Sequence, residues 1–111
     1  KEKGVKAVFE EAWKIASEKT KGVHISFDLD VIDPNVAPGV SIPEFDGITE
    51  QQAMDINAEI IKHLKDVTSY DLVEFNPLRD ENRKTEQIAV NLLAQIIRGF
   101  ENIKKLPEKK Y

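Results

Sequence analysis

The chain contains no cysteine, no long apolar run and no excess of positive charge. Without cysteine it can form neither disulfides nor thiolate metal sites, and this fits a reducing compartment such as the cytoplasm. No apolar run approaches the ~20 residues that a membrane-spanning helix needs, and no stretch has the pattern of a secretory signal peptide. The net charge of −4, without a basic stripe interleaved with aromatic residues, gives no reason to expect nucleic acid. We therefore expect a cytoplasmic protein that binds neither nucleic acid nor membrane.

The residues that are present describe an ordinary globular chain, because 41% are hydrophobic and 32% are charged. The length allows one domain with a real core. Apolar residues recur at helical spacing in three segments, whereas two segments have strand patterns. We expect helices over about 5–19, 49–65 and from 85 onward, with strands over about 23–30 and 68–75. This order predicts an α/β fold, a parallel-sheet βαβ unit with flanking helices.

Local signals mark several boundaries of these elements. Thr49 and Gln52 have the spacing of a capping box, which predicts the start of the second helix. The segment 31–47 holds three of the five prolines and two of the five glycines, so we expect an ordered loop. Gly99 either ends the third helix or lies within it, and residues 104–111 are interpreted as a solvated basic tail.

Acidic residues gather where the first expected strand ends. Asp28 and Asp30 alternate with apolar residues, so their side chains should share one face, roughly 7 Å apart at the backbone. The two carboxylates repel each other and lose water, and a divalent metal would compensate both costs. Mg²⁺ and Mn²⁺ prefer carboxylate oxygen, which makes a metal site the favoured interpretation. An EF-hand is excluded because Ile32 occupies a ligand position and the required glycine is missing.

Glu74 is an acidic residue inside an apolar strand, so it needs either a partner or a task. The carboxyl ends of neighbouring parallel strands meet at one edge of a sheet, where ligands gather. We therefore expect Glu74 to converge with Asp28 and Asp30. A cationic ligand would serve as its partner.

Three further polar residues are assigned structural roles. Asp33 precedes Pro34 and should anchor a turn through backbone donors. His24 lies too far back along the strand to share a metal with Asp30, so we expect a buried, hydrogen-bonded histidine. His63 lies beside lysines on the second helix and is expected at the surface.

Two separated motifs resemble one protein family. The sequence SFDLDVIDP over 26–34 and APGVS over 37–41 precede DLVEFNP over 71–77, with Asp80 and Thr85 following. Together they resemble the carboxyl-terminal third of a ureohydrolase, the family of arginase, agmatinase and formimidoylglutamase. The resemblance extends from residue 23 to about residue 98. It implies that the βαβ unit is part of a three-layer α/β/α fold around a parallel sheet.

The resemblance also implies an activity and the roles of individual residues. Two Mn²⁺ ions would activate a bridging hydroxide that attacks a guanidinium or formimidoyl carbon, after which the C–N bond breaks. By position, Asp28 would bridge the metals and Asp30 would complete the shell of one, which makes both metal ligands and catalytic residues. Glu74 would bind the cationic end of a small-molecule guanidino or formimidoyl substrate. The family further implies a homo-oligomer, either a trimer or a hexamer.

Departures from the family pattern concern the remaining ligands and the substrate. The family takes its other metal ligands from an upstream segment of the Asp-Ala-His-x-Asp type, and nothing here matches it. We therefore expect residues 1–111 to be the carboxyl-terminal portion of a single catalytic domain, inactive alone. Ile42 stands where arginases and agmatinases commonly have threonine, whereas the APGVS wording is also common in formimidoylglutamase-like members. Arginine, agmatine and formimidoylglutamate all stay open as substrates.

Two other interpretations remain at this point. Residues 27–30 also resemble the first motif of haloacid-dehalogenase-type phosphatases, with Asp28 as nucleophile and Asp30 as acid. Those enzymes continue with glycine and threonine, where this chain has Val31 and Ile32. The second alternative is a non-catalytic remnant or interaction module, and an upstream histidine-containing segment would discriminate against it.

Overall fold

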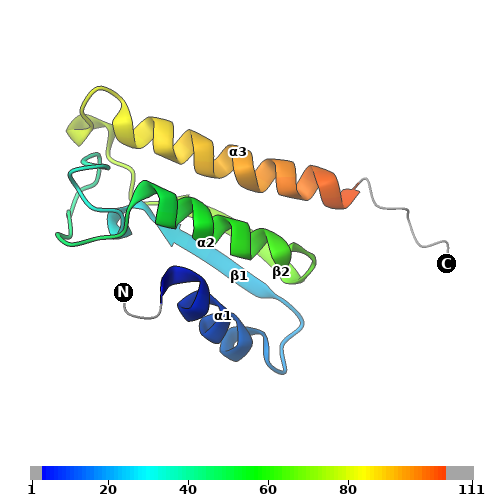
Figure 1. Cartoon of the computed structure of the whole chain (residues 1–111). Helices are drawn as coiled ribbons and strands as arrows, with labels where there is room; N and C mark the ends of the chain where they lie inside the picture. Colours follow the sequence, from blue (N-terminus) through cyan, green and yellow to red (C-terminus); the bar gives the residue numbers. More distant parts are fainter. Residues whose placement is uncertain (1–3, 105–111) are drawn as a thin grey trace.

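The computed structural model describes residues 4–104. Five main elements follow one another along the chain (Figure 1): α1 (Gly4–Ser17), β1 (Val23–Asp28), α2 (Glu50–Lys62), β2 (Val67–Val73) and α3 (Lys84–Lys104). Three short 3₁₀ turns join them: η1 (Leu29–Val31), η2 (Leu64–Asp66) and η3 (Pro77–Arg79). β1 and β2 pair in parallel. The predicted order of elements and the parallel βαβ unit are confirmed.

Both strands end earlier than the sequence pattern predicts. β1 stops at Asp28, and Asp30 lies in the 3₁₀ turn that follows. β2 stops at Val73, because Glu74 adopts a left-handed backbone with φ of 71°. A positive φ takes a non-glycine residue out of the extended region and interrupts the alternation of side chains. Asp30 and Glu74 therefore lie just beyond the strands rather than on them.

The helix boundaries follow from caps and close packing. The predicted capping box is present, with the Thr49 hydroxyl accepting from the Gln52 backbone and the Gln52 side chain accepting from the Thr49 backbone. α3 continues through Gly99, where an added Cβ would lie 3.0 Å from Leu64 Cδ2 and 3.1 Å from Ile61 Cγ1. Gly99 thus allows α3 to pack closely against the end of α2. Most of the expected basic tail lies outside the described residues. No helix within residues 4–104 is long and apolar enough to cross a membrane.

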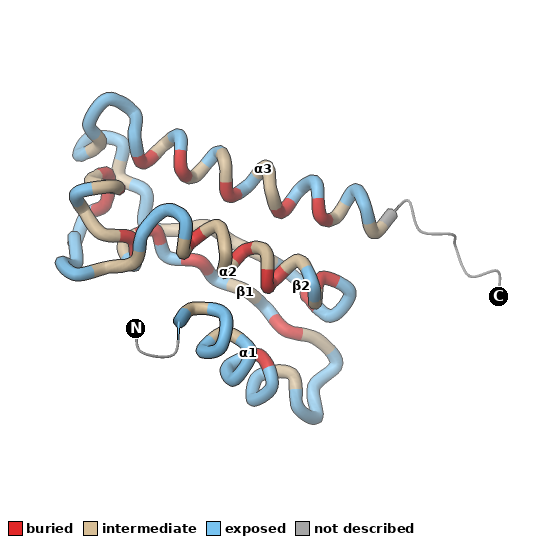
Figure 2. Tube along the Cα trace, viewed as in Figure 1, coloured by how far each residue is buried: buried red, intermediate tan, exposed pale blue. Residues whose placement is uncertain are grey.

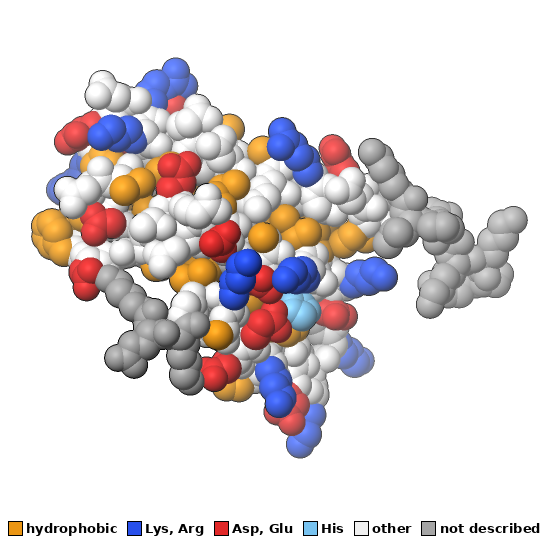
Figure 3. All heavy atoms as spheres, viewed as in Figure 1, with side chains coloured by type: hydrophobic (Ala, Val, Ile, Leu, Met, Phe, Trp, Pro, Cys, Tyr) orange, Lys and Arg blue, Asp and Glu red, His pale blue; other side chains and the backbone are white. Residues whose placement is uncertain are grey.

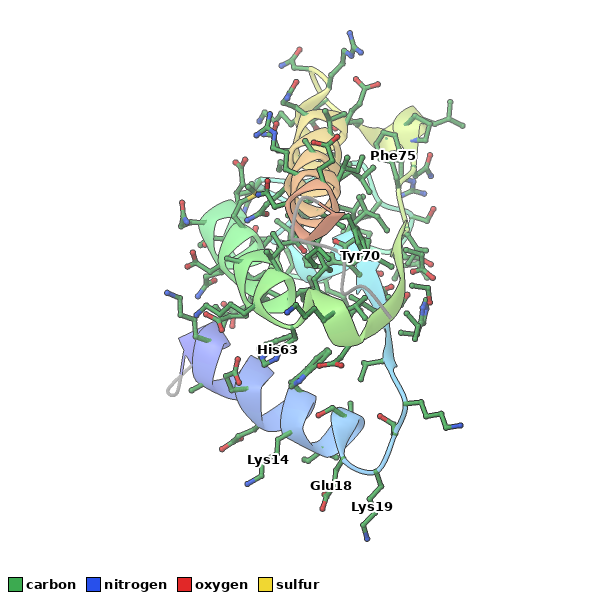
Figure 4. The ribbon with its side chains drawn as sticks, turned by 90° about the vertical axis from the view of Figure 1, so that its right-hand side faces the viewer. Lys14, Glu18, Lys19, His63, Tyr70 and Phe75 are labelled. Atoms are coloured by element: carbon green, nitrogen blue, oxygen red, sulfur yellow. The ribbon has the colours of Figure 1, made fainter. Side chains whose placement is uncertain are left out.

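The helices lie on one side of the two strands (Figures 1 and 4). On β1 the side chains facing the helices are buried or half-buried, while those on the other face are exposed. In the part of the chain described here, one sheet face is therefore covered and the other is open. Figure 2 shows the buried positions along the sides of the helices that face the strands and each other.

Two apolar clusters make up the core of the covered face. The cluster nearer the carboxyl ends of the strands contains Phe27, Leu29, Ile32, Ala37, Val40, Ala53, Ile88 and Leu92. Because this cluster includes residues of the loop between η1 and α2, that loop is ordered without regular secondary structure. The other contains Trp13, Val23, Ile60, Leu64, Val67 and Ile96. Outside the core, acidic and basic side chains are interspersed on the face that Figure 3 shows.

Candidate metal and substrate site

Carboxylates crowd the carboxyl end of β1, as the sequence predicts. Asp28 is exposed and Asp30 is partly buried. Burial raises the pKa of Asp30, and the negative charges of Asp28 and Glu44 raise it further, against a backbone hydrogen bond that lowers it. Asp28 and Glu44 therefore each repel the Asp30 carboxylate, a cost that a bound cation would offset. The sequence pattern did not predict Glu44 at this site, because Glu44 lies in an irregular loop whose path cannot be inferred from periodicity.

Glu74 lies at the same end of the sheet, just beyond β2. The strand register pairs Asp28 with Val73, so Glu74 is the next residue after the partner of Asp28. Strict alternation would send its side chain to the covered face together with that of Leu72. The left-handed backbone at Glu74 interrupts that alternation, and Glu74 is exposed. Its convergence with the two aspartates stays a prediction.

The donor chemistry at this edge suits a hard metal ion only in part. Asp28 and Asp30 offer carboxylate oxygens, which Mn²⁺ and Mg²⁺ prefer. Within residues 4–104, however, no group of three or more histidine, cysteine, aspartate or glutamate side chains could hold a metal ion. The described residues thus supply at most part of a ligand set.

Backbone hydrogen bonds hold the loop that follows Asp30. Ile32 and Ile48 form a parallel bridge, and the Asp33 N–H donates to the Ile48 carbonyl at 2.9 Å. The Asp33 carboxylate accepts from the Asn35 N–H at 2.9 Å, which confirms its predicted role as a turn anchor. Gly47 is required for space, because a Cβ there would lie 2.5 Å from the Val31 carbonyl oxygen. The loop is therefore pinned at both of its ends.

His24 is hydrogen-bonded as predicted, but the prediction that it is buried is wrong. Its side chain is 52% exposed because it points to the open face of the sheet. Its Nδ1 shares a hydrogen bond with the Ser69 hydroxyl, and its Nε2 lies 3.2 Å from an Asp71 carboxylate oxygen. The Ser26 hydroxyl donates to the other Asp71 oxygen at 2.6 Å. These four side chains form a polar network behind the acidic edge.

His63 is not the plain surface residue that the sequence suggested. Its ring stacks on that of Trp13, with centroids 4.5 Å apart and planes inclined by 17°. Its Nε2 lies 3.1 Å from a carboxylate oxygen of Glu10. Figure 4 shows His63 at the junction of α1 and α2. It attaches α1 to the rest of the fold and lies far along the chain from the acidic edge.

The arginase-family model matches residues 1–98 of this chain. Among similar proteins, an arginase of Bacillus caldovelox is 39% identical over 93 residues, which are 84% of this chain and 31% of that protein. The human mitochondrial guanidino acid hydrolase is 40% identical over 79 residues, which are 69% of this chain and 21% of that protein. The chain thus spans about a third or less of the length of these relatives.

The structure agrees with these sequence matches. The crystallised arginase of Bacillus caldovelox superposes with a TM-score of 0.77 at 38% identity, covering 84% of this chain and 31% of that one. A formiminoglutamase of Trypanosoma cruzi, whose structure was determined with Mn²⁺, superposes with a TM-score of 0.78 at 31% identity, covering 89% and 33%. These matches favour the ureohydrolase interpretation over the phosphatase one. The chain belongs to the arginase family.

Proposed function

We propose that this chain is the carboxyl-terminal portion of the catalytic domain of a manganese-dependent hydrolase. The intact enzyme would break a C–N bond in a guanidino or formimidoyl compound. The observation that carries the proposal is the mutually repelling pair Asp28 and Asp30 at the carboxyl end of β1, in a chain of the arginase family. Such a pair is costly unless a cation offsets its charge.

Asp28 and Asp30 would hold the metal, with Asp28 shared between two ions. The metal pair, when bound, supplies a water molecule activated as hydroxide at neutral pH. The partial burial of Asp30 supports this role, because a carboxylate that has lost part of its hydration gains from a cation nearby. The turn η1 and the loop pinned behind it would fix the backbone that carries both carboxylates.

Glu74 would bind the cationic end of the substrate. Its exposed position at the end of β2 leaves it accessible, and its left-handed backbone is the kind of strain that persists at functional sites. A guanidinium or formimidoyl cation presents N–H donors that a carboxylate accepts in a charge-assisted pair. Arginine, agmatine and formimidoylglutamate all satisfy this chemistry, and relatives of this chain include arginases and a formiminoglutamase.

The 111-residue chain alone should be inactive. Two carboxylates are too few to hold two metal ions tightly, and within residues 4–104 no third metal-binding side chain joins them. The intact enzyme would supply the remaining ligands from outside this chain. We further propose that it is a cytoplasmic homo-oligomer, a trimer or a hexamer as in the family.

The test is hydrolysis by the intact enzyme loaded with Mn²⁺, assayed separately with arginine, agmatine and formimidoylglutamate. We expect turnover of one of the three and a loss of more than ~100-fold in Asp30→Asn together with lost Mn²⁺, since even residues that only support ligands cost 10–100-fold. Glu74→Gln should lose turnover while retaining Mn²⁺. Asp66→Asn, a matched exposed aspartate in η2 at the far end of the sheet, should behave as wild type. Wild-type turnover in Asp30→Asn would defeat the site assignment, and an inactive intact enzyme would favour a non-catalytic remnant.

A further inference from the structure

The peptide group of Gly39 joins three segments that come from different parts of the chain. Its carbonyl accepts from the Asn76 N–H at 2.7 Å, and its own N–H donates to the Thr85 hydroxyl oxygen at 2.8 Å. Gly39 and Thr85 are both buried, and Thr85 has no exposed surface. Buried polar groups of this kind are stable only when paired. The loop after β1, the turn after β2 and the start of α3 therefore meet at one residue.

Only glycine fits where the loop meets the start of α3. A Cβ on Gly39 would lie 2.9 Å from both Cβ and Oγ1 of Thr85 and 3.0 Å from Cβ of Asp80. Contacts this short force a displacement. Any side chain at position 39 would thus push the loop away from the Thr85 hydroxyl.

Asp80 holds Thr85 in place. One Asp80 carboxylate oxygen accepts from the backbone of Glu81 at 2.9 Å and of Thr85 at 3.0 Å, and the other accepts from Glu86 N–H at 3.0 Å. Burial raises the pKa of Asp80, but these hydrogen bonds and one from the Thr85 side chain outweigh burial and leave the pKa below its ordinary value. The carboxylate thereby caps the first turn of α3 and fixes the residue that holds Gly39.

Asn76 carries this connection to the end of β2. Its backbone bonds to Gly39, its side-chain amide donates to the Ser41 hydroxyl at 3.1 Å, and its side-chain oxygen accepts from Leu78 N–H at 3.1 Å. Glu74 lies two residues earlier, between Asn76 and the last ladder residue of β2. A left-handed backbone at a non-glycine residue persists only when its surroundings over-determine it. The strand on one side and Asn76 on the other provide that constraint.

We propose that Gly39, Thr85 and Asp80 are positioning residues, which hold Glu74 through Asn76 in its left-handed conformation at the end of β2, from which it would bind the substrate. The loop that carries Gly39 follows Asp30. The hydrogen bonds of Gly39 would therefore fix the position of Glu74 relative to the two aspartates. This inference rests on the proposed function, because it assigns a substrate-binding role to Glu74.

The test compares Thr85→Val with Thr85→Ser in the intact, Mn²⁺-loaded enzyme. Valine matches threonine in shape but offers no acceptor to the Gly39 N–H, whereas serine retains the hydroxyl. We expect Thr85→Val to lose about 10–100-fold in kcat/KM, mostly through a higher KM, with unchanged Mn²⁺ content. Thr85→Ser should stay within about threefold of wild type. Wild-type kcat/KM in Thr85→Val, or a loss that serine does not rescue, would overturn the proposal.

Amide hydrogen exchange separates this proposal from the proposed function. In Thr85→Val, exchange over residues 74–78 should accelerate at least tenfold while exchange in α2 stays unchanged. Ser41→Ala removes only the exposed hydrogen bond with Asn76 and should accelerate exchange over residues 74–78 by a smaller factor. This variant replaces Thr85→Val if the latter does not fold. If the wild type hydrolyses none of the substrates, the proposed function fails, whereas the exchange result still decides whether this contact holds Glu74. Unchanged exchange over 74–78 would contradict it.

Discussion

The two faces of the β1–β2 sheet differ in what holds them. On the covered face, Phe27 lies in an apolar cluster beneath the helices, and Leu72 packs against it. On the open face, the exposed polar side chains contact one another: the Ser26 hydroxyl donates to Asp71, and His24 Nε2 lies 3.2 Å from an Asp71 carboxylate oxygen. Burial of apolar area stabilises far more than exposed polar pairs do. Most of the stability of the described fold therefore comes from the covered face.

Polar connections also cross the covered side, and the one at Asn57 is fully buried. Asn57 has no exposed surface, donates to the Leu92 carbonyl at 3.1 Å and accepts from the Tyr70 hydroxyl at 3.0 Å. Burial, together with the negative charge of Asp71, raises the pKa of Tyr70 to about 12, although the hydrogen bond to Asn57 lowers it. The loss of one side-chain hydrogen bond should therefore lower the free energy of unfolding more on the covered face than on the open face.

The largest effect should come from removing apolar volume on the covered side. Leu92→Ala deletes a side chain with no exposed surface and should lower the free energy of unfolding by about 3 kcal/mol. Its neighbour Leu93 is 40% exposed, so Leu93→Ala should cost less than about 1 kcal/mol. Urea unfolding of both variants measures the difference. Equal losses would mean that α3 does not pack as described.

Hydroxyl removal compares the two faces directly. Tyr70→Phe leaves the buried Asn57 amide oxygen without its donor and should cost about 1–2 kcal/mol. Ser69→Ala removes the contact with His24 on the open face and should change stability by less than about 0.5 kcal/mol. The same unfolding assay applies. A larger loss from Ser69→Ala would show that the open face contributes more stability than its exposure suggests.

Acid should weaken the cap of α3. The pKa of Asp80 is lower in the folded chain than its ordinary 3.8, so its contribution is present above that value and is lost as pH falls through the folded pKa. Asp80→Asn should cost about 1 kcal/mol near pH 7 and progressively less below pH 3.8. Unfolding curves between acid and neutral pH measure this. An unchanged acid slope in Asp80→Asn would contradict the assigned hydrogen bonds.

The acidic edge should respond to pH with the opposite sign. The pKa of Asp30 is raised by burial and by Asp28 and Glu44, so its ionisation destabilises the metal-free fold as pH rises through the folded pKa. Asp30→Asn should therefore slightly stabilise the metal-free chain at pH 7 and not below pH 3.8. Titration of stability against pH, without metal, tests the sign. A destabilised Asp30→Asn at neutral pH would mean that the carboxylate already has a partner.

Sequence patterns predicted the features of the fold that are set by residues close together in the chain. The helical and strand periodicities gave the order of elements, and the Thr49–Gln52 spacing gave the start of α2, since both depend on local backbone geometry. The strand ends were missed because a left-handed Glu74 and a 3₁₀ turn after Asp28 carry no clear local signal.

The histidines show the same limit. His24 was expected to be a buried, hydrogen-bonded residue because it lies too far back along the strand to share a metal with Asp30. Burial depends instead on what covers that face of the sheet, and the His24 side chain is 52% exposed. His63 was expected at the surface because of its lysine neighbours, yet Trp13, fifty positions earlier, stacks on it. The strand patterns and then the family motifs marked Asp28, Asp30 and Glu74 as candidates. Glu44 belongs to no motif, and only the path of the loop in the structure shows that its charge acts on Asp30.

The most direct measurement is a crystal structure of the intact enzyme with Mn²⁺ and a bound guanidino compound. We predict that Asp28 and Asp30 coordinate the metal and that the Glu74 carboxylate lies on the same edge, paired with the guanidinium. A Glu74 carboxylate pointing into the helix-covered face, or metal bound without the two aspartates, would contradict the account.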